Sequence, residues 1–160
     1  MKKQTIELLA PAGSWEALEA AVNAGADAVY MGGKAFGARQ YASNFDREEM
    51  QKAVYFAHMH RVRLYITVNT LVDDSELSEL ADYLLFLNNV GIDGIIVQDL
   101  GVIRLARQIV PDLPLHASTQ MTVTNSEGVK LAAEAGMERV VLARELSLEE
   151  INTICHGTDT

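Results

Sequence analysis

Residues 24–30 read AGADAVY, and the same pattern returns as VGIDGII at residues 90–96 and as AGMERVV at residues 135–141. In each copy a glycine is followed two positions later by an acidic residue and then by an apolar run. Glycine readily takes the left-handed conformation that ends a helix. The pattern therefore predicts a helix end, a tight turn and a buried strand at three places in the chain.

Short apolar runs of the same kind recur along the whole sequence. Most are continuous, as expected of parallel strands that are covered on both faces. Helical periodicity fills the intervals, most clearly at residues 77–87 and 102–110. Capping-box spacing predicts helix starts at Asp46 with Glu49, Thr124 with Glu127, and Ser147 with Glu150. The predicted strands lie at residues 6–10, 28–31, 64–68, 94–97, 115–117 and 139–142.

Six alternating strand and helix units define an α/β chain with right-handed crossovers. Such units form either an open doubly wound sheet or a barrel. An eight-unit barrel takes about 250 residues, whereas this chain has 160. The residues thus predict either a small open sheet or about six of the eight units of a truncated barrel.

The composition limits the function classes. The chain has 13 Lys and Arg against 22 Asp and Glu, a formal net charge of −9 at pH 7. That balance argues against a broad basic face for nucleic acid, although a local basic patch remains compatible with it. No apolar stretch reaches the roughly 20 residues of a membrane span, so no membrane partner is expected. The single cysteine, Cys155, excludes an internal disulfide and suits the cytoplasm.

In both architectures ligands bind at the carboxyl ends of the strands. The longest loop there holds Gly32, Gly33 and Gly37 with Lys34 and Arg39, and it suits an anion held by backbone N–H groups and a bidentate arginine. The alternative is a connection with turn glycines, and no nucleotide fingerprint is present. The full set of candidate substrate-binding residues is Gly32, Gly33, Arg39, Asn69, Gln98, Gln120, Arg144 and Glu145.

A nucleophilic site is a weaker hypothesis. His116 and Ser118 are two residues apart in a predicted strand, so they share one face, and Asp99 ends the preceding strand. A Ser/His/Asp hydrolase has these residue types, but the chain lacks a G-x-S-x-G elbow. The alternative is a polar layer at the barrel mouth. The other histidines and Cys155 have no spacing that predicts a metal site in this chain.

Five segments, taken together, resemble the start of the collagenase-like U-32 peptidase family. They are residues 7–14, 25–33, 36–45, 97–101 and 142–147, which cover the chain in order. The resemblance implies a TIM-barrel-like catalytic domain within a longer protein. We therefore expect residues 1–160 to form a partial (β/α) barrel with about six of eight units, the N-terminal part of that protein.

The resemblance also implies a function. Some members are named for collagen degradation, whereas others resemble enzymes that hydroxylate a base of tRNA or rRNA, or that act in ubiquinone hydroxylation, with an iron–sulfur cluster on four cysteines. In the family a His-Gly-x-x-Cys segment opens the cysteine region, and no cysteine follows His156-Gly157 here. We expect the cluster in the full-length parent and no cofactor in this chain.

Three functions stay open. The parent hydroxylates RNA, with RNA as its partner, or it is a genuine peptidase with a peptide substrate; if the chain is complete, it is a non-enzymatic binding module. The isolated 160-residue chain is expected to be inactive. It is also expected to self-associate, because a cut barrel leaves strand edges unpaired.

Overall fold

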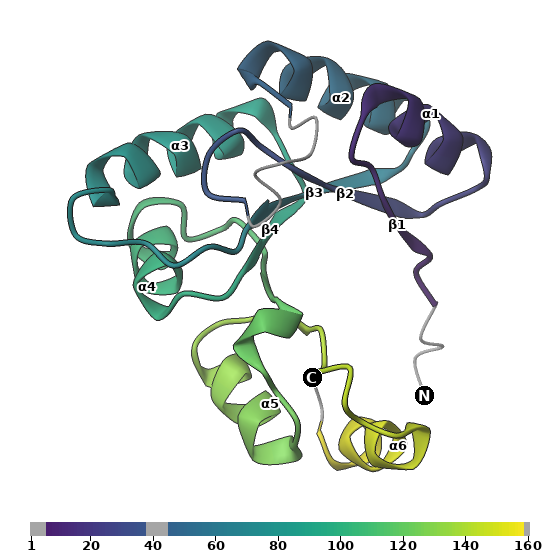
Figure 1. Ribbon diagram of the computed structural model, residues 1–160, viewed down its shortest axis with the longest axis vertical. Coiled ribbons are helices and arrows are strands. Elements are labelled where there is room, and N and C mark those ends of the chain that lie inside the picture. The colour runs from purple at the N-terminus through teal and green to yellow at the C-terminus, as the bar shows by residue number, and fades with distance from the viewer. Residues whose placement is uncertain (1–5, 38–44, 159–160) are drawn as a thin grey trace.

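The computed structural model describes residues 6–37 and 45–158, and over these residues parallel strands alternate with helices (Figure 1). The sheet has the order β1-β2-β3-β4-β5-β6, so each strand pairs with its neighbours in sequence. The elements are β1 (Leu9–Pro11), α1 (Trp15–Asn23), β2 (Ala28–Gly32), α2 (Arg47–Met59), β3 (Arg63–Val68), α3 (Leu77–Val90), β4 (Gly94–Val97), α4 (Leu100–Ile109), β5 (Leu115–Ala117), η1 (Thr119–Met121), α5 (Ser126–Glu134), β6 (Arg139–Val140) and α6 (Leu148–Gly157).

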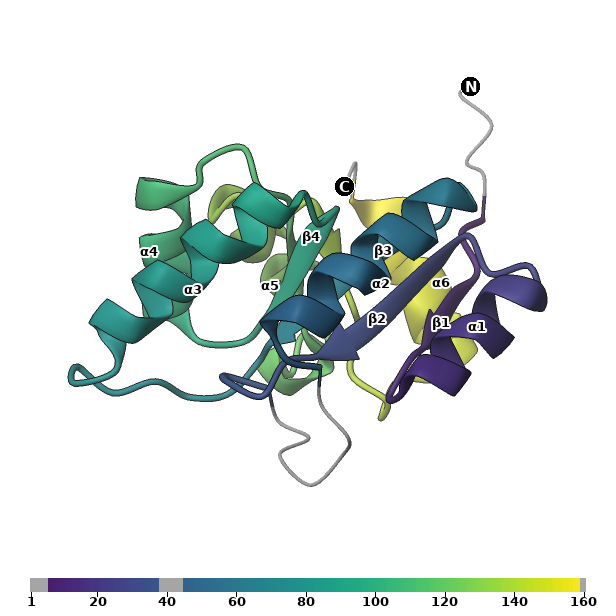
Figure 2. The ribbon, with the colours of Figure 1, turned by 90° about the horizontal axis from the view of Figure 1, so that it is seen from above.

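This arrangement is a half-barrel. Figures 1 and 2 show the strands curving around one side of a common axis, with the helices outside them. A doubly wound sheet would reverse its strand order and carry helices on both faces. The prediction of a TIM-barrel-like fold with about six βα units is therefore confirmed, and the open-sheet alternative is wrong.

The two faces of the sheet pack differently. The face toward the helices forms the main core, in which strand residues such as Val29, Ile66 and Ile95 pack with Leu18 and Leu84 from the helices. The inner face carries a smaller cluster of Ala28, Tyr65 and Ile96, with Leu9 and Tyr30 packed against it. Side chains alternate between the faces of a strand, so the inner face can carry chemistry without weakening the core.

The repeated glycine and acidic residues make the expected turns. Gly25, Gly91 and Gly136 have φ values of 86°, 82° and 88°, which confirms the left-handed helix ends. Asp27 accepts a hydrogen bond from the backbone N–H of Leu8 at 2.7 Å. Asp93 does the same for Leu64 at 2.8 Å. Each aspartate therefore anchors its own turn to the chain at the start of the strand before it.

The predicted helix starts at Asp46 and Ser147 are confirmed, each with both hydrogen bonds of a capping box. The start at Thr124 is wrong by one residue: Asn125 caps α5, and its side chain accepts from the N–H of Gly128 at 2.9 Å. Asparagine caps at least as well as threonine. No helix of the described residues is both long and apolar enough to cross a membrane.

The outermost strands are shorter than predicted. The first was expected at residues 6–10 and lies at Leu9–Pro11, and the last was expected at residues 139–142 and covers Arg139–Val140. Within the described residues both strands have a partner on one side only. A strand that pairs on one side only holds fewer residues in register. The apolar pattern alone therefore predicts edge strands that are too long.

Gly33, which follows β2, serves packing. It is buried, and a Cβ atom at this position would lie 2.2 Å from Tyr83 Oη and 2.4 Å from Met50 Cε. These two side chains come from α3 and α2. The glycine thus lets both helices approach the end of β2.

Gly33→Ala is expected to lower the free energy of unfolding by about 1–3 kcal/mol, since overpacking displaces the buried Tyr83 ring. Urea denaturation of the purified chain measures this change. Gly13→Ala is the matched control, because nothing lies within 4 Å of a Cβ there. If Gly33→Ala is as stable as Gly13→Ala, the packing role is wrong.

Candidate functional site

A cavity of about 750 Å³ opens on the inner face at the carboxyl ends of the strands, and we refer to it as the lumen cavity. Every strand, or the loop after it, contributes to its wall. This is the end of a (β/α) barrel at which active sites are found. The lining residues are Leu9, Ala12, Gly13, Tyr30, Met31, Gly32, Thr67, Asn69, Ile96, Ser118, Thr119, Gln120, Val141, Leu142 and Arg144.

The register of the sheet brings these side chains together. Gly32 pairs with Thr67, Thr67 with Ile96, and Ile96 with His116, so one row crosses four strands. Because paired residues of neighbouring strands point to the same face, this whole row faces inward. Strand pairing thus places Gly32, Thr67 and Ile96 in the wall, and the loops after the strands supply much of the remaining lining.

Hydrogen bonds hold several polar groups of the wall in place. Gln98 donates from Nε2 to the backbone carbonyl of Asn69 at 2.8 Å, which joins the ends of β3 and β4. The Ser118 side chain is buried and accepts from the N–H of Gln120 at 3.2 Å. The loops at the mouth of the cavity are therefore tied to each other and to the sheet.

A charged cluster occupies the opposite end of the inner face, and we call it the Glu7 cluster: Glu7, Arg63, Tyr65 and Arg139. The Glu7 carboxylate pairs with both guanidinium groups and accepts from Tyr65 Oη at 3.2 Å. Burial by itself would raise the pKa of Glu7. The hydrogen bond and charge of Arg139, with the charge of Arg63, outweigh burial and hold that pKa below its ordinary value of 4.5.

His116 lies on the inner face of the sheet, and its ring contacts that of Tyr65 edge to face, 4.6 Å between centroids. Burial, aided by the charge of Arg139, lowers the pKa of His116 to about 4. The imidazole is consequently neutral at pH 7. A neutral His116 contributes no positive charge to the binding of an anion.

The structure does not assemble the Ser/His/Asp set. The Asp99 carboxylate caps α4, where it accepts from the N–H groups of Gly101 at 2.7 Å and Val102 at 3.1 Å. No hydrogen bond within the described part of the chain joins His116 to Ser118 or Asp99. Asp99 is satisfied by its own helix, and the ring of His116 packs against that of Tyr65.

The remaining candidates fall into three groups. Gly32, Asn69, Gln120 and Arg144 line the lumen cavity together with Ser118. Three others are placed elsewhere: Gln98 supports Asn69, Gly33 packs against α2 and α3, and Glu145 is exposed beyond the cavity lining. Lys34 pairs with Asp46 at 3.2 Å. Arg39 lies outside the described residues.

Sequence reasoning missed the Glu7 cluster and Tyr30. One signal was available for Glu7, because it is the charged residue inside an otherwise apolar run. Alternation along β3 also places Arg63, Tyr65 and Thr67 on one face. The partnership of Glu7 with Arg139 had no local signal.

The residues present do not fit an iron–sulfur cluster. Such a cluster takes about four thiolates, whereas the sequence contains one cysteine, the exposed Cys155. Over residues 6–37 and 45–158, no group of three or more His, Cys, Asp or Glu side chains is placed to hold a metal ion. No metal chemistry is assigned to these side chains.

Comparison with known proteins gives a consistent family. The sequence profile of peptidase family U32 matches residues 13–160. The tRNA hydroxylation protein P1 of Bacillus subtilis is 41% identical over 96% of this chain and 36% of its own length. The 23S rRNA 5-hydroxycytidine C2501 synthase of Escherichia coli is 40% identical over 96% of the chain and 23% of its length.

Two further similarities bear on function and fold. A protein of Porphyromonas gingivalis named collagenase is 33% identical over 96% of the chain and 37% of its own length. The chain thus spans less than two fifths of each of these three relatives. The solved structure of the U32 peptidase Mk0906 superposes with a TM-score of 0.79 over all of this chain and 68% of that one, at 15% identity, which supports the fold.

Glu7→Gln tests the Glu7 cluster. At pH 7 this change is expected to lower the free energy of unfolding by about 1–3 kcal/mol, because a largely buried charge partner of two arginines is lost. The lowered pKa means that Glu7 contributes its stability above about pH 4.5 and loses it as pH falls through the folded-state pKa. Denaturation of both proteins from pH 3 to 8 should show curves that converge only in acid.

Glu127→Gln is the matched control, since Glu127 pairs with Lys130 in the open on α5 and surface pairs contribute little. A stability difference for Glu7→Gln that persists unchanged at pH 3 would contradict the ionic account.

Proposed function

Because the chain belongs to peptidase family U32, we propose that the protein takes part in hydroxylating a base of tRNA or rRNA. The observation that carries this proposal is the 40–41% identity, over 96% of the chain, to two relatives named for RNA hydroxylation. We also propose that residues 1–160 are the N-terminal part of a longer barrel-containing protein, because each relative is more than twice this length.

The lumen cavity supports the proposal. Its wall combines apolar surface from Leu9, Ile96 and Val141 with the ring of Tyr30 and the amide of Gln120. A base turned out of an RNA strand is held by such a combination, aromatic contact on its face and hydrogen bonds on its edge. A site inside the half-barrel would admit a single base and exclude a duplex.

The peptidase alternative has less support in this chain. The relative named collagenase is 33% identical. The residues that would act as nucleophile, base and acid are not joined, since Asp99 caps α4 and His116 contacts Tyr65. The deletion experiment described below therefore also measures peptide hydrolysis.

An iron–sulfur cluster, if the protein uses one, draws its cysteines from outside these 160 residues, because Cys155 alone cannot supply them. We therefore expect no turnover of RNA or collagen by the 160-residue chain alone. The cytoplasm is the proposed location, where tRNA and ribosomes would be the substrates.

The test is mass spectrometry of nucleosides from tRNA and rRNA of a strain that lacks the gene. We expect one hydroxylated nucleoside to disappear, to return with the complete gene, and not to return with the first 160 codons alone. A full complement of hydroxylated nucleosides in the deletion strain would overturn the proposal. Loss of collagen degradation in the same strain would favour the peptidase.

We further propose that the isolated chain self-associates through the exposed edges of β1 and β6, which lack a second strand partner in the described residues. Sedimentation velocity from micromolar to near-millimolar concentration should show a dimer or larger species that dissociates on dilution. A monomer throughout that range would refute self-association.

A further inference from the structure

We infer that Arg144 binds the phosphate of a nucleotide whose base lies against Tyr30 in the lumen cavity. This inference rests on the proposed function and adds to it the contact that positions the substrate. Two observations carry it: the charge of Arg144 has no protein partner, and it faces a cavity that also contains an unpaired aromatic hydroxyl.

Arg144 is the charged member of the cavity lining. Among the described residues it takes part in no ion pair and no hydrogen bond. Other arginines are engaged: Arg63 and Arg139 pair with Glu7, and Arg107 donates to the carbonyls of Pro111 and Leu113. The fold therefore uses these guanidinium groups and leaves that of Arg144 available at the mouth of the cavity.

The position of this cation is notable given the charge of the chain. The formal net charge is −9, yet among the described residues the lining of the lumen cavity contains a cation and no acidic side chain. A guanidinium group presents paired N–H donors that match the oxygens of a phosphate. A site with this lining attracts an anionic group such as the phosphate of a nucleotide.

Tyr30 supplies the second contact. It is half-buried on β2, where it packs against the inner cluster of Ala28, Tyr65 and Ile96. Its hydroxyl makes no hydrogen bond within the part of the chain that the structure describes, unlike that of Tyr65, which donates to Glu7. A fixed ring with a free polar edge in a cavity is suited to stack on a nucleobase.

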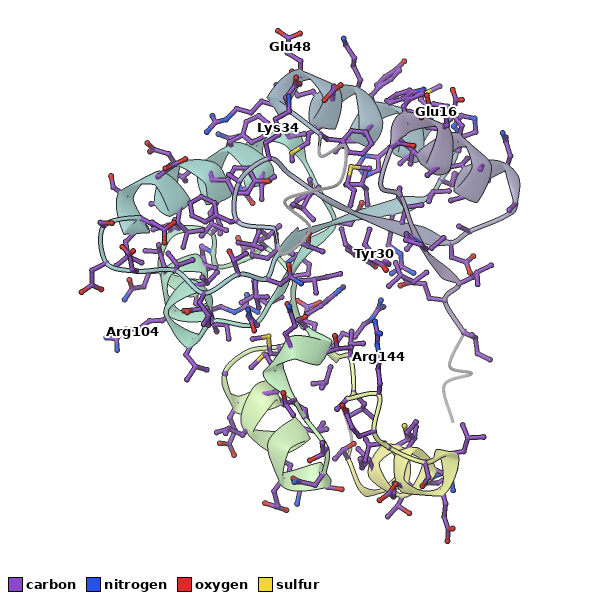
Figure 3. All side chains as sticks on the ribbon, viewed as in Figure 1. Glu16, Tyr30, Lys34, Glu48, Arg104 and Arg144 are labelled. Atoms are coloured by element: carbon purple, nitrogen blue, oxygen red, sulfur yellow. The ribbon has the colours of Figure 1, made fainter. Side chains whose placement is uncertain are left out.

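The two residues face each other. Tyr30 lies on β2 and Arg144 on the loop after β6, and Figure 3 shows the Arg144 side chain extending from that loop into the opening toward the strand with Tyr30. Both line the same cavity of about 750 Å³, a volume within the range of small-ligand sites. A nucleotide would place its base deep against Tyr30 and its phosphate outward at Arg144.

The probes are cytidine 5′-monophosphate and cytidine, titrated into the ¹⁵N-labelled 160-residue chain and followed by NMR. Wild-type chain is expected to bind the nucleotide at least about ten-fold more tightly than the nucleoside, because hydrogen bonds to charged groups are strong. Arg144→Gln should remove that advantage and leave cytidine affinity unchanged. Tyr30→Leu should weaken both ligands.

Arg104→Gln is the matched control. Arg104 is an exposed arginine on α4 that points away from the lumen cavity (Figure 3), so this variant should bind both ligands like the wild type. Shifts of the backbone signals of Gly32, Thr67 and Gln120 on titration would place the ligand in the cavity. Unchanged thermal melting of Arg144→Gln would show that the variant is folded.

Equal binding of nucleotide and nucleoside by the wild type, no binding of either, or equal loss in Arg144→Gln and Arg104→Gln would each overturn the inference. Arg144-dependent binding of a short peptide in place of the nucleotide would also overturn it. The nucleoside analysis of the deletion strain is independent. Loss of a hydroxylated nucleoside there, with no effect of Arg144→Gln on binding, would refute the phosphate contact and leave the proposed function standing.

Discussion

The carboxylate of Glu7 connects the first and last strands of the half-barrel. It lies just before β1 and pairs with Arg139 at the start of β6 and with Arg63 at the start of β3. A closed barrel joins its outer strands through a backbone ladder, but β1 and β6 are not neighbours in this sheet. Side-chain ion pairs across the inner face therefore link the two edge strands, at the end opposite the lumen cavity.

This constraint divides the inner face into two regions with different roles. At the amino ends of the strands the charges are paired. The two arginines lower the pKa of Glu7 although burial opposes them, whereas burial is the main cause of the lowered pKa of His116. At the carboxyl ends the polar groups are held by loops but leave donors and acceptors for a ligand. In a (β/α) barrel the first end contributes stability and the second contributes function. Arg139 and Arg144 illustrate the division, since Arg139 begins β6 in the Glu7 cluster and Arg144 lies on the loop after β6 at the lumen cavity.

The fold could be predicted because its signals are local. Each turn at Gly25, Gly91 and Gly136 is specified by adjacent residues, and a helix end can be identified without knowing its partner. Local rules failed where two neighbours had equal chemistry, as at Thr124 and Asn125. They also failed for the Glu7 cluster, because Glu7 and Arg139 are 132 residues apart. The predicted topology placed Asn69, Gln120 and Arg144 near the cavity. It could not show which polar groups would already form hydrogen bonds or ion pairs within the protein.

The candidate triad could not be judged from the sequence for the same reason. The pairing of polar groups also bears on whether a compact or an extended ligand fits the site. An aspartate at this position could serve as a helix cap or as a catalytic acid. The Asp99 carboxylate accepts hydrogen bonds from N–H groups at the start of α4, so it serves as the cap. An extended peptide would need free backbone partners along its binding surface, whereas the backbone groups of β2 to β5 pair with neighbouring strands on both sides. Over these strands the inner face therefore offers a ligand mainly side chains. A flat, compact group with one attached anion satisfies such a wall better than a polypeptide does.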